Sequence, residues 1–134
     1  MPREKKTWCE KLAAAKAKPD LPKVFFCEKS KQRLLVPSPG QVEQLMLRVP
    51  AGRVVTISQI ADRLKADHDA DAACSMTAGI FAWIIAHAAE ERRAAGAQGA
   101  GVPWWRLLKA GGELNPKYPG GGQTQKRLLA AEGL

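Results

Sequence analysis

Cysteine, histidine and long apolar runs are scarce in this chain of 134 residues. Its three cysteines stand far apart at positions 9, 27 and 74, and no C-x-x-C occurs. An odd number of widely spaced cysteines excludes a disulfide framework, and the two histidines are not spaced as a ligand pair, so we expect no structural metal site. No apolar run reaches the roughly 18 residues of a membrane-spanning helix. Because the charged residues 1–6 precede no apolar stretch, we expect no secretory signal and a cytoplasmic location.

The chain carries a basic excess that is unevenly distributed. Lys and Arg number 21 against 13 Asp and Glu, which gives a net charge of +8. Residues 1–33 hold ten basic and four acidic residues, a net +6, whereas residues 34–105 hold six and seven. A cationic segment beside a near-neutral one favours a polyanionic partner, because neutralising phosphates releases counterions. Solubility is the simpler explanation of the charge, and the charge does not distinguish DNA from RNA.

Capping residues and chain breaks divide the sequence into helices and short extended segments. Thr7, Ser38 and Thr56 have the pattern of helix N-caps, and Pro39 suits a first helical position. We predict helices at about 7–18, from residue 39, at 57–64, at about 72–94 and at 123–132. The runs 24–26 and 34–36 are either edge strands or docking segments. Residues 104–108 read as a strand followed by a hairpin turn at Gly111 and Gly112.

The element order predicts an α+β fold, mostly helical, with a winged helix-turn-helix domain at 38–134, a small hairpin and a basic N-terminal arm at 1–37. The break at 37–40 marks the boundary. On the long helix, one apolar stripe is expected to face the core; its members are Ala73, Met76, Ile80, Trp83, Ile84 and His87. His87 is more simply a core histidine than a catalyst.

A set of short motifs recurs in a fixed order in the second part of the chain. In chain order they are Val49, Pro50, Ala51, Gly52, Arg53, Val54, Val55 and Thr56; Gln59, Ile60 and Ala61; Ala72 and Ala73; Pro103, Trp104, Trp105, Arg106 and Leu107; Gly112, Glu113 and Leu114; Tyr118, Gly120 and Gly121; Leu128, Leu129, Glu132 and Gly133. In order and spacing, residues 42–133 resemble the C-terminal domain of alkylguanine-DNA alkyltransferases and their alkyltransferase-like relatives.

The resemblance implies a DNA-binding surface and a base pocket. The expected DNA contacts are Thr56, Ile57, Ser58, Gln59, Cys74, Ser75, Thr77, Arg106 and Lys117, and the expected pocket residues are Trp104, Trp105 and Tyr118. For some of these an alternative stays open. The tryptophans either line the pocket by stacking or belong to the core, and Arg106 either contacts DNA or pairs with a carboxylate inside the fold.

Departures from the family pattern argue against catalysis. Trp104 stands where the repair enzymes carry the alkyl-accepting cysteine, and Trp105 stands where they carry the activating histidine. Glu132 matches the acid that polarises this histidine, but its partner is missing. An indole offers neither a thiolate nor a titratable base. The resemblance is therefore to the non-enzymatic alkyltransferase-like type, which binds alkylated guanine and signals to other repair proteins.

Further departures affect lesion recognition. Ile57 occupies the position of the family's nucleotide-flipping tyrosine, and Cys74 that of the arginine that fills the gap. Base extrusion costs a few kcal/mol and needs a side chain that holds the stack open. Pro119 replaces a small hydroxyl residue. Three aspartates, Asp67, Asp69 and Asp71, precede the expected recognition helix and would repel phosphate.

The function expected first is a non-catalytic DNA-binding protein without metal or cofactor, with duplex DNA, alkylated guanine and other repair proteins as candidate partners. The basic segment 1–33 is expected to supply most of the affinity. Two alternatives stand beside it. One is a protein-interaction or regulatory domain that kept the fold and lost DNA. The other is an alkyltransferase with a relocated cysteine, for which Cys74 is the only thiol in the matched domain.

Overall fold

The computed structural model describes residues 7–97 and 101–134, and the α+β class with a helical majority is confirmed within them. The first six residues of the predicted basic arm, and residues 98–100, lie outside this description. The elements are α1 (Trp8–Lys16), β1 (Lys23–Cys27), β2 (Gln32–Val36), α2 (Pro39–Leu47), β3 (Val55–Thr56), α3 (Ile57–Asp67), β4 (Ala72–Ala73), α4 (Ser75–Ala94), the 3-10 helix η1 (Trp104–Arg106), β5 (Leu107–Leu108) and α5 (Gly121–Ala130).

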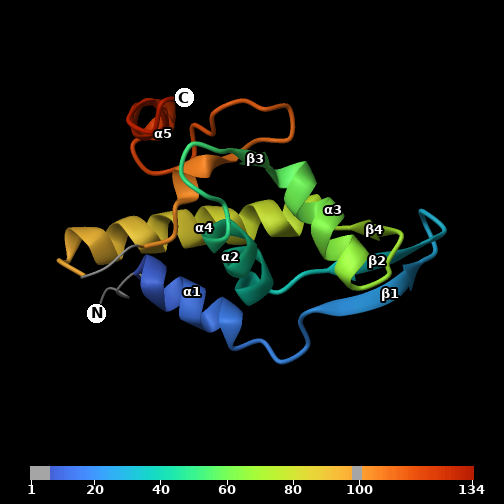
Figure 1. Cartoon of the computed structure of the whole chain (residues 1–134). Helices are drawn as coiled ribbons and strands as arrows, with labels where there is room; N and C mark the ends of the chain where they lie inside the picture. Colours follow the sequence, from blue (N-terminus) through green and yellow to red (C-terminus); the bar gives the residue numbers. More distant parts are fainter. Residues whose placement is uncertain (1–6, 98–100) are drawn as a thin grey trace, which may run out of the picture.

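The long helix α4 is the centre of the molecule, and α1, α2 and α3 pack against it (Figure 1). Its buried residues are Ala78, Phe81, Ala82, Ile85, Ala86 and Ala88. The predicted stripe is confirmed only in part: Ala73, Trp83 and Ile84 pack partly buried against the core, whereas Met76 and Ile80 are 72% and 48% exposed. Apolar residues occur on most sides of this helix, so their spacing did not single out the buried face. Four alanines on that face leave room for neighbouring helices to approach closely.

The predicted starts of α1, α2 and α3 are confirmed by their capping contacts, whereas α4 and α5 begin at Ser75 and Gly121 instead of at 72 and 123. The Thr7 hydroxyl accepts the Glu10 N–H at 3.1 Å. Ser38 and Thr56 each form a full capping box with the glutamine three residues later, and Pro39 is the first residue of α2. Each box satisfies two N–H groups that a helix start would otherwise leave unpaired.

The strands agree with the sequence prediction in part: the runs 24–26 and 34–36 lie in strands β1 and β2, which was one of their two alternatives, whereas residues 72–73 and 104–106 differ. β1 pairs antiparallel with β2, and β2 pairs parallel with β4. Residues 72–73 are therefore a strand rather than the start of the long helix. β3 pairs parallel with β5. Residues 104–106 form η1 instead of strand, and no hairpin of paired strands forms around Gly111 and Gly112 in the described chain. The loop there closes through main-chain bonds of Lys109 to Glu113 and of Gly112 to Lys109, at 2.9 and 2.8 Å.

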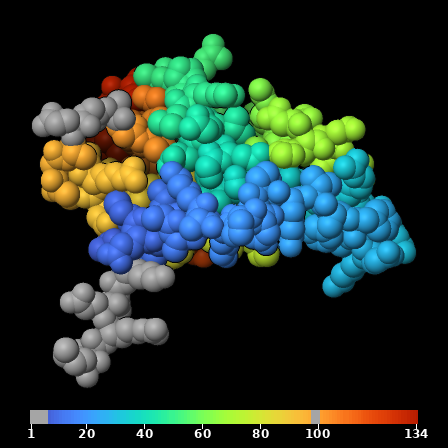
Figure 2. Space-filling view, turned by 90° about the horizontal axis from the view of Figure 1, so that it is seen from below, coloured from blue at the N-terminus to red at the C-terminus, as the bar shows by residue number. Residues whose placement is uncertain are grey.

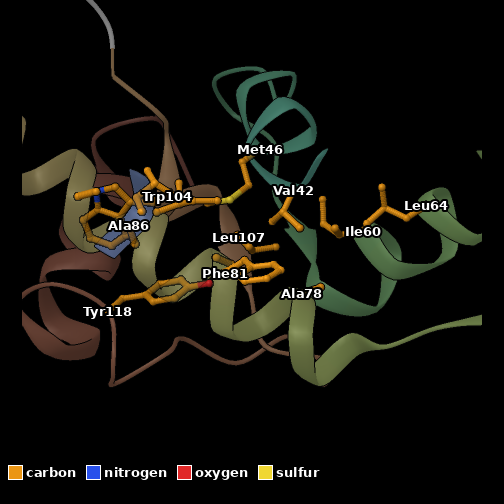
Figure 3. Close-up of a cluster of buried hydrophobic side chains, with 14 of the residues drawn as sticks. Val42, Met46, Ile60, Leu64, Ala78, Phe81, Ala86, Trp104, Leu107 and Tyr118 are labelled. Atoms are coloured by element: carbon orange, nitrogen blue, oxygen red, sulfur yellow. The ribbon is translucent and has the colours of Figure 1, made fainter. Parts of the chain in front are cut away.

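The N-terminal segment packs into the same core as the rest of the chain. Leu12 is 2% exposed and belongs to the cluster that contains Val42, Met46 and Trp104 (Figure 3 shows much of this cluster). The N–H groups at the start of α1 are bound by a carboxylate of α4, since Trp8 and Cys9 donate to Glu91 at 2.9 and 3.1 Å. Residues 7–36 are thus not a detached arm. The domain boundary at 37/38 and the winged helix-turn-helix topology stay predictions.

Two absences hold for the described ranges. No helix there is long and apolar enough to cross a bilayer. Within the same ranges, no three His, Cys, Asp or Glu side chains come together as metal ligands would.

Candidate nucleic-acid interface

The helix pair α3 and α4 is joined by residues 68–74. Four predicted DNA contacts lie at the start of α3, and two of them serve the helix itself: the Gln59 carboxamide accepts the Thr56 N–H at 2.8 Å, and the Thr56 hydroxyl accepts the Gln59 N–H at 3.2 Å. Ile57 packs partly buried against the core, and Ser58 is half-buried. This helix start therefore offers few free polar groups to a ligand.

The first turns of α4 present apolar side chains to solvent. Cys74 precedes the helix, with its sulfur 3.1 Å from the Thr77 hydroxyl. Ser75 is exposed, and beyond it Met76 and Ile80 are the large exposed side chains. A DNA-reading helix is ordinarily richer in Arg or Lys. The first turns of α4 offer no Lys or Arg to a DNA phosphate, so any phosphate contact beside them needs basic residues from other segments.

The predicted pocket rings contact one another, and two of them, Trp104 and Trp105, also line a cavity of about 240 Å³ together with Glu90, Arg93 and Val102, whereas Tyr118 is not part of its lining. Trp104 is fully buried, and its ring meets those of Trp105 and Tyr118 edge-on, with centroids 5.9 and 5.8 Å apart. Figure 3 shows Trp104 and Tyr118 inside the core beside Leu107. Tyr118 is 4% exposed, and burial raises its pKa to about 12. Both rings act as core residues in this arrangement.

One carboxylate holds the Trp104 indole. The Trp104 Nε1–H donates to Glu90 Oε1 at 3.2 Å, and Arg93 pairs with the same Glu90 carboxylate at 2.6 Å. The Arg93 guanidinium and then the Trp104 N–H lower the pKa of Glu90. An ionised, hydrogen-bonded acceptor thus fixes the orientation of the indole. Glu90 was missed as a site residue, because its place in a run of four charged residues is typical of a solvated helix end.

Arg106 pairs with a carboxylate inside the fold, which was one of the two alternatives. The guanidinium donates to both Glu132 oxygens, from Nε at 3.1 and 3.2 Å and from Nη2 at 2.5 Å. Nη1 donates to the Val49 carbonyl at 2.7 Å. The Arg106 and Glu132 side chains are 14% and 16% exposed. These bonds join η1, the end of α2 and the C-terminal turn.

The loop that carries Lys117 is fixed to α4 through its main chain. The Lys117 carbonyl accepts the Trp83 Nε1–H at 3.1 Å and a hydrogen bond from His87 Nε2 at 2.8 Å. His87 also stacks on Trp8, with ring centroids 4.3 Å apart. His87 is therefore a hydrogen-bonded structural histidine. The Lys117 side chain stays exposed.

A cleft of about 370 Å³ lies between α4 and this loop. Its lining residues are Met76, Gly79, Ile80, Trp83, Lys109, Asn115, Pro116 and Lys117. The walls are apolar on the α4 side, and two lysines stand on the loop side. The lining contains no acidic residue, so the cleft suits a partly apolar, anionic ligand.

Gln125 is a second residue that the sequence analysis missed. It is fully buried, donates to the carbonyls of Trp105 and Leu107 at 3.1 and 2.9 Å, and accepts the Asn115 N–H at 2.9 Å. It thereby holds η1, β5 and the loop in one arrangement. A signal was present, because Gln125 precedes Leu128 and Leu129 by three and four residues and so shares their helix face.

Cys74 and Cys9 are poorly placed for alkyl transfer. Cys74 precedes Glu90, the partner of Trp104, by 16 positions along α4, which corresponds to about 24 Å. Cys9 lies nearer to Glu90 along α4, because its sulfur is 3.6 Å from the Ala88 carbonyl. Burial and then the neighbouring Glu91 raise the pKa of Cys9, so its thiol holds its proton at neutral pH. Proton retention makes a thiol a weak nucleophile.

Comparison with known families places the matched region at residues 38–134, where the family model for the 6-O-methylguanine DNA methyltransferase DNA-binding domain fits. No significant match was found among curated proteins or among solved structures. The matched region begins at the predicted boundary and contains η1, the cleft and the pair α3 and α4. Because the match covers more than half of the residues, the chain belongs to the family of 6-O-methylguanine DNA methyltransferase DNA-binding domains.

Proposed function

We propose that this protein is a non-catalytic, alkyltransferase-like DNA-binding protein that recognises alkylated guanine in duplex DNA. The observation that carries the proposal is the environment of Trp104. In the motif resemblance, this residue matches the acceptor position of the family; in the structure it is fully buried, and its indole N–H is bonded to Glu90.

The chemistry of alkyl transfer supports the non-catalytic part. The transfer needs a thiolate and a neighbouring base, and an indole is neither. Glu132, which matches the acid that would polarise the histidine, is paired with Arg106. Glu132 thus forms an ion pair within the fold, where the family's acid would polarise a histidine.

The cleft beside α4 is the proposed DNA contact. Lys109 and Lys117 supply positive charge, and Met76 and Ile80 supply apolar surface. Apolar side chains that enter a base step open the stack. Exposure favours Met76 over Ile57 for this role, because Ile57 packs against the core and Met76 is 72% exposed.

Binding is tested by titrating duplex DNA, with and without a single O6-methylguanine, over a range of salt concentrations. We expect tighter binding to the modified duplex and an affinity that falls as salt rises. Met76→Ala is expected to reduce the preference for the modified duplex, whereas Leu47→Ala, at an exposed residue of α2, leaves it unchanged. Equal affinity for both duplexes would remove lesion recognition from the proposal.

Exposed apolar surface also supports a second candidate, a protein-interaction domain. Met76 and Ile80 together resemble a docking stripe on α4, and the acidic residues Asp67, Asp69 and Asp71 lie at the end of α3 and in the segment that leads to α4. This candidate predicts no duplex binding even at low salt. The same titration therefore decides between the two.

Catalysis is tested by single-turnover transfer of a labelled methyl group from methylated DNA to the protein. We expect no label on the wild-type chain and none on Trp104→Cys, because a free thiol has a pKa of about 8.5 and Trp105 supplies no base. Trp104→Cys with Trp105→His is expected to transfer weakly. Thermal unfolding of each variant accompanies the assay, since loss of a buried indole costs about 3–5 kcal/mol. Label on the wild-type chain would overturn the non-catalytic proposal.

A further inference from the structure

The strands β1 and β2 form a ribbon that lies at the end of the molecule where α4 begins (Figures 1 and 2). It precedes residue 38 and so lies outside the region that the family comparison matched. We propose that this ribbon is a second DNA-binding surface, which contacts the duplex next to the segment held at α4. This inference rests on the proposed function, because it takes duplex DNA as the ligand.

Backbone pairing fixes the ribbon to the start of α4. In the parallel pairing of β2 with β4, Leu34 and Leu35 are the partners of Ala72 and Ala73. The Leu35 carbonyl accepts the N–H of Cys74, the residue that precedes α4, at 2.8 Å. A ligand that contacts the first turn of α4 therefore has the ribbon beside it in a set position.

The same pairing brings positive charge to an acidic turn. The Arg33 N–H donates to Asp71 Oδ2 at 2.8 Å, and the Arg33 guanidinium donates to the Asp69 carbonyl at 3.3 Å. The aspartates before α4 would otherwise repel phosphate. The ribbon supplies charge of the sign that this part of the surface lacks.

The ribbon combines cations with exposed aromatic rings. Residues 23–33 hold four basic residues, Lys23, Lys29, Lys31 and Arg33, against the single acid Glu28. Phe25 and Phe26 are 42% and 54% exposed, and the Lys23 ammonium lies 5.9 Å from the Phe25 ring centroid. Neighbouring residues of a strand point to opposite faces, so each face of the ribbon carries one phenylalanine.

This combination favours DNA over a protein partner. A two-stranded ribbon fits the major groove, and an exposed phenylalanine can wedge between base steps in the minor groove. Lysines bind phosphates in either case. A protein strand added to the edge of β1 would bind through main-chain hydrogen bonds. Such binding would use neither the lysines nor the phenylalanine rings of the ribbon.

The test compares two variants of the full chain with a charge-matched control. Lys29→Gln with Lys31→Asn removes two cations, and asparagine suits position 31, where φ is +57°. Phe25→Ser with Phe26→Ser removes the rings. Lys11→Gln with Lys18→Gln removes two cations from the helix α1 and the turn after it. Each is titrated with duplexes of about one and about three helical turns over a salt series.

On the long duplex, the ribbon lysine variant is expected to lower the slope of log affinity against log salt by about 1.8, and the control much less. The phenylalanine variant is expected to bind about fivefold or more weakly with an unchanged slope. On the short duplex both ribbon variants are expected to approach the wild-type affinity. Wild-type binding that neither ribbon variant weakens would overturn the inference and leave the proposed function intact. Absence of wild-type binding would overturn both.

Discussion

At position 106 a guanidinium meets a carboxylate and a main-chain carbonyl that come from the two ends of the matched region. Replacing Arg106 by alanine leaves Glu132 without its partner and frees the Val49 carbonyl. We expect the free energy of unfolding to fall by about 2–4 kcal/mol, as for other largely buried ion pairs that lose one member. Urea unfolding measures this loss.

Two further variants separate the structural role of Arg106 from DNA binding. Arg106→Lys keeps the positive charge but cannot donate to both Glu132 oxygens in the way that the planar guanidinium does. We therefore expect a loss of stability smaller than that of Arg106→Ala. Lys126→Ala removes an exposed charge from α5 and should change stability by no more than about 0.5 kcal/mol. DNA binding that weakens in Arg106→Lys, with stability unchanged, would show that Arg106 contacts DNA.

The same ion pair predicts a pH dependence. Arg106 lowers the pKa of Glu132, so the pair stabilises the fold above the unfolded glutamate pKa of about 4.3. This contribution is lost as the pH falls through the lower, folded value. Wild type should therefore lose more stability than Glu132→Gln between about pH 6 and about pH 3, as measured by urea unfolding. Parallel curves for the two proteins would contradict the assignment.

Among the elements, α1 decides whether the N-terminal segment is an arm or part of the fold. Leu12 is its buried residue. Leu12→Ala should lower the free energy of unfolding by about 2–5 kcal/mol, through lost burial and the cavity left in the core. Lys18→Ala, at an exposed position after the same helix, should have little effect. Equal stability of the two variants would mean that α1 does not hold the core together.

Local signals explain which elements could be predicted from sequence. The starts of α1, α2 and α3 depend on Thr7, Ser38 and Thr56, whose capping contacts span three residues. The strands β3, β4 and β5 have two residues each and exist only through pairing with distant segments. Nothing near them in sequence encodes that pairing. Positions 104–106 are typical of a strand by residue type, but Gln125 and Glu132 bind them as a 3-10 turn.

For the candidate site, motif order was enough to predict the family, but it could not reveal what the residues contact. Trp104 and Tyr118 were predicted to line a base pocket, and their rings contact each other edge-on. Their burial depends on Glu90, Lys117 and the packing of α1, which lie outside the motif. The cleft beside α4 was missed for the same reason: the exposure of Met76 and Ile80 follows from which face of α4 the other helices cover.

At the scale of the whole molecule, the basic segment 1–33 also contributes residues such as Leu12 to the hydrophobic core. Deleting residues 1–33 tests the basic segment most directly, because it lowers the net charge from +8 to +2. The deletion also removes α1 with Leu12, and β1, the partner strand of β2. Loss of DNA binding in the truncated chain would therefore report unfolding as readily as lost phosphate contacts.

Charge removal with the fold kept intact is the sharper experiment. Six lysines of this segment can be replaced by glutamine, which again gives a net charge of +2; they are Lys5, Lys6, Lys11, Lys18, Lys23 and Lys29. If the segment supplies most of the affinity, the salt slope should fall by about 0.9 for each lysine that contacts a phosphate. Cooperative urea unfolding should persist in this variant and be lost in the truncation. An unchanged salt slope in a folded variant would show that the basic segment has a purpose other than binding DNA.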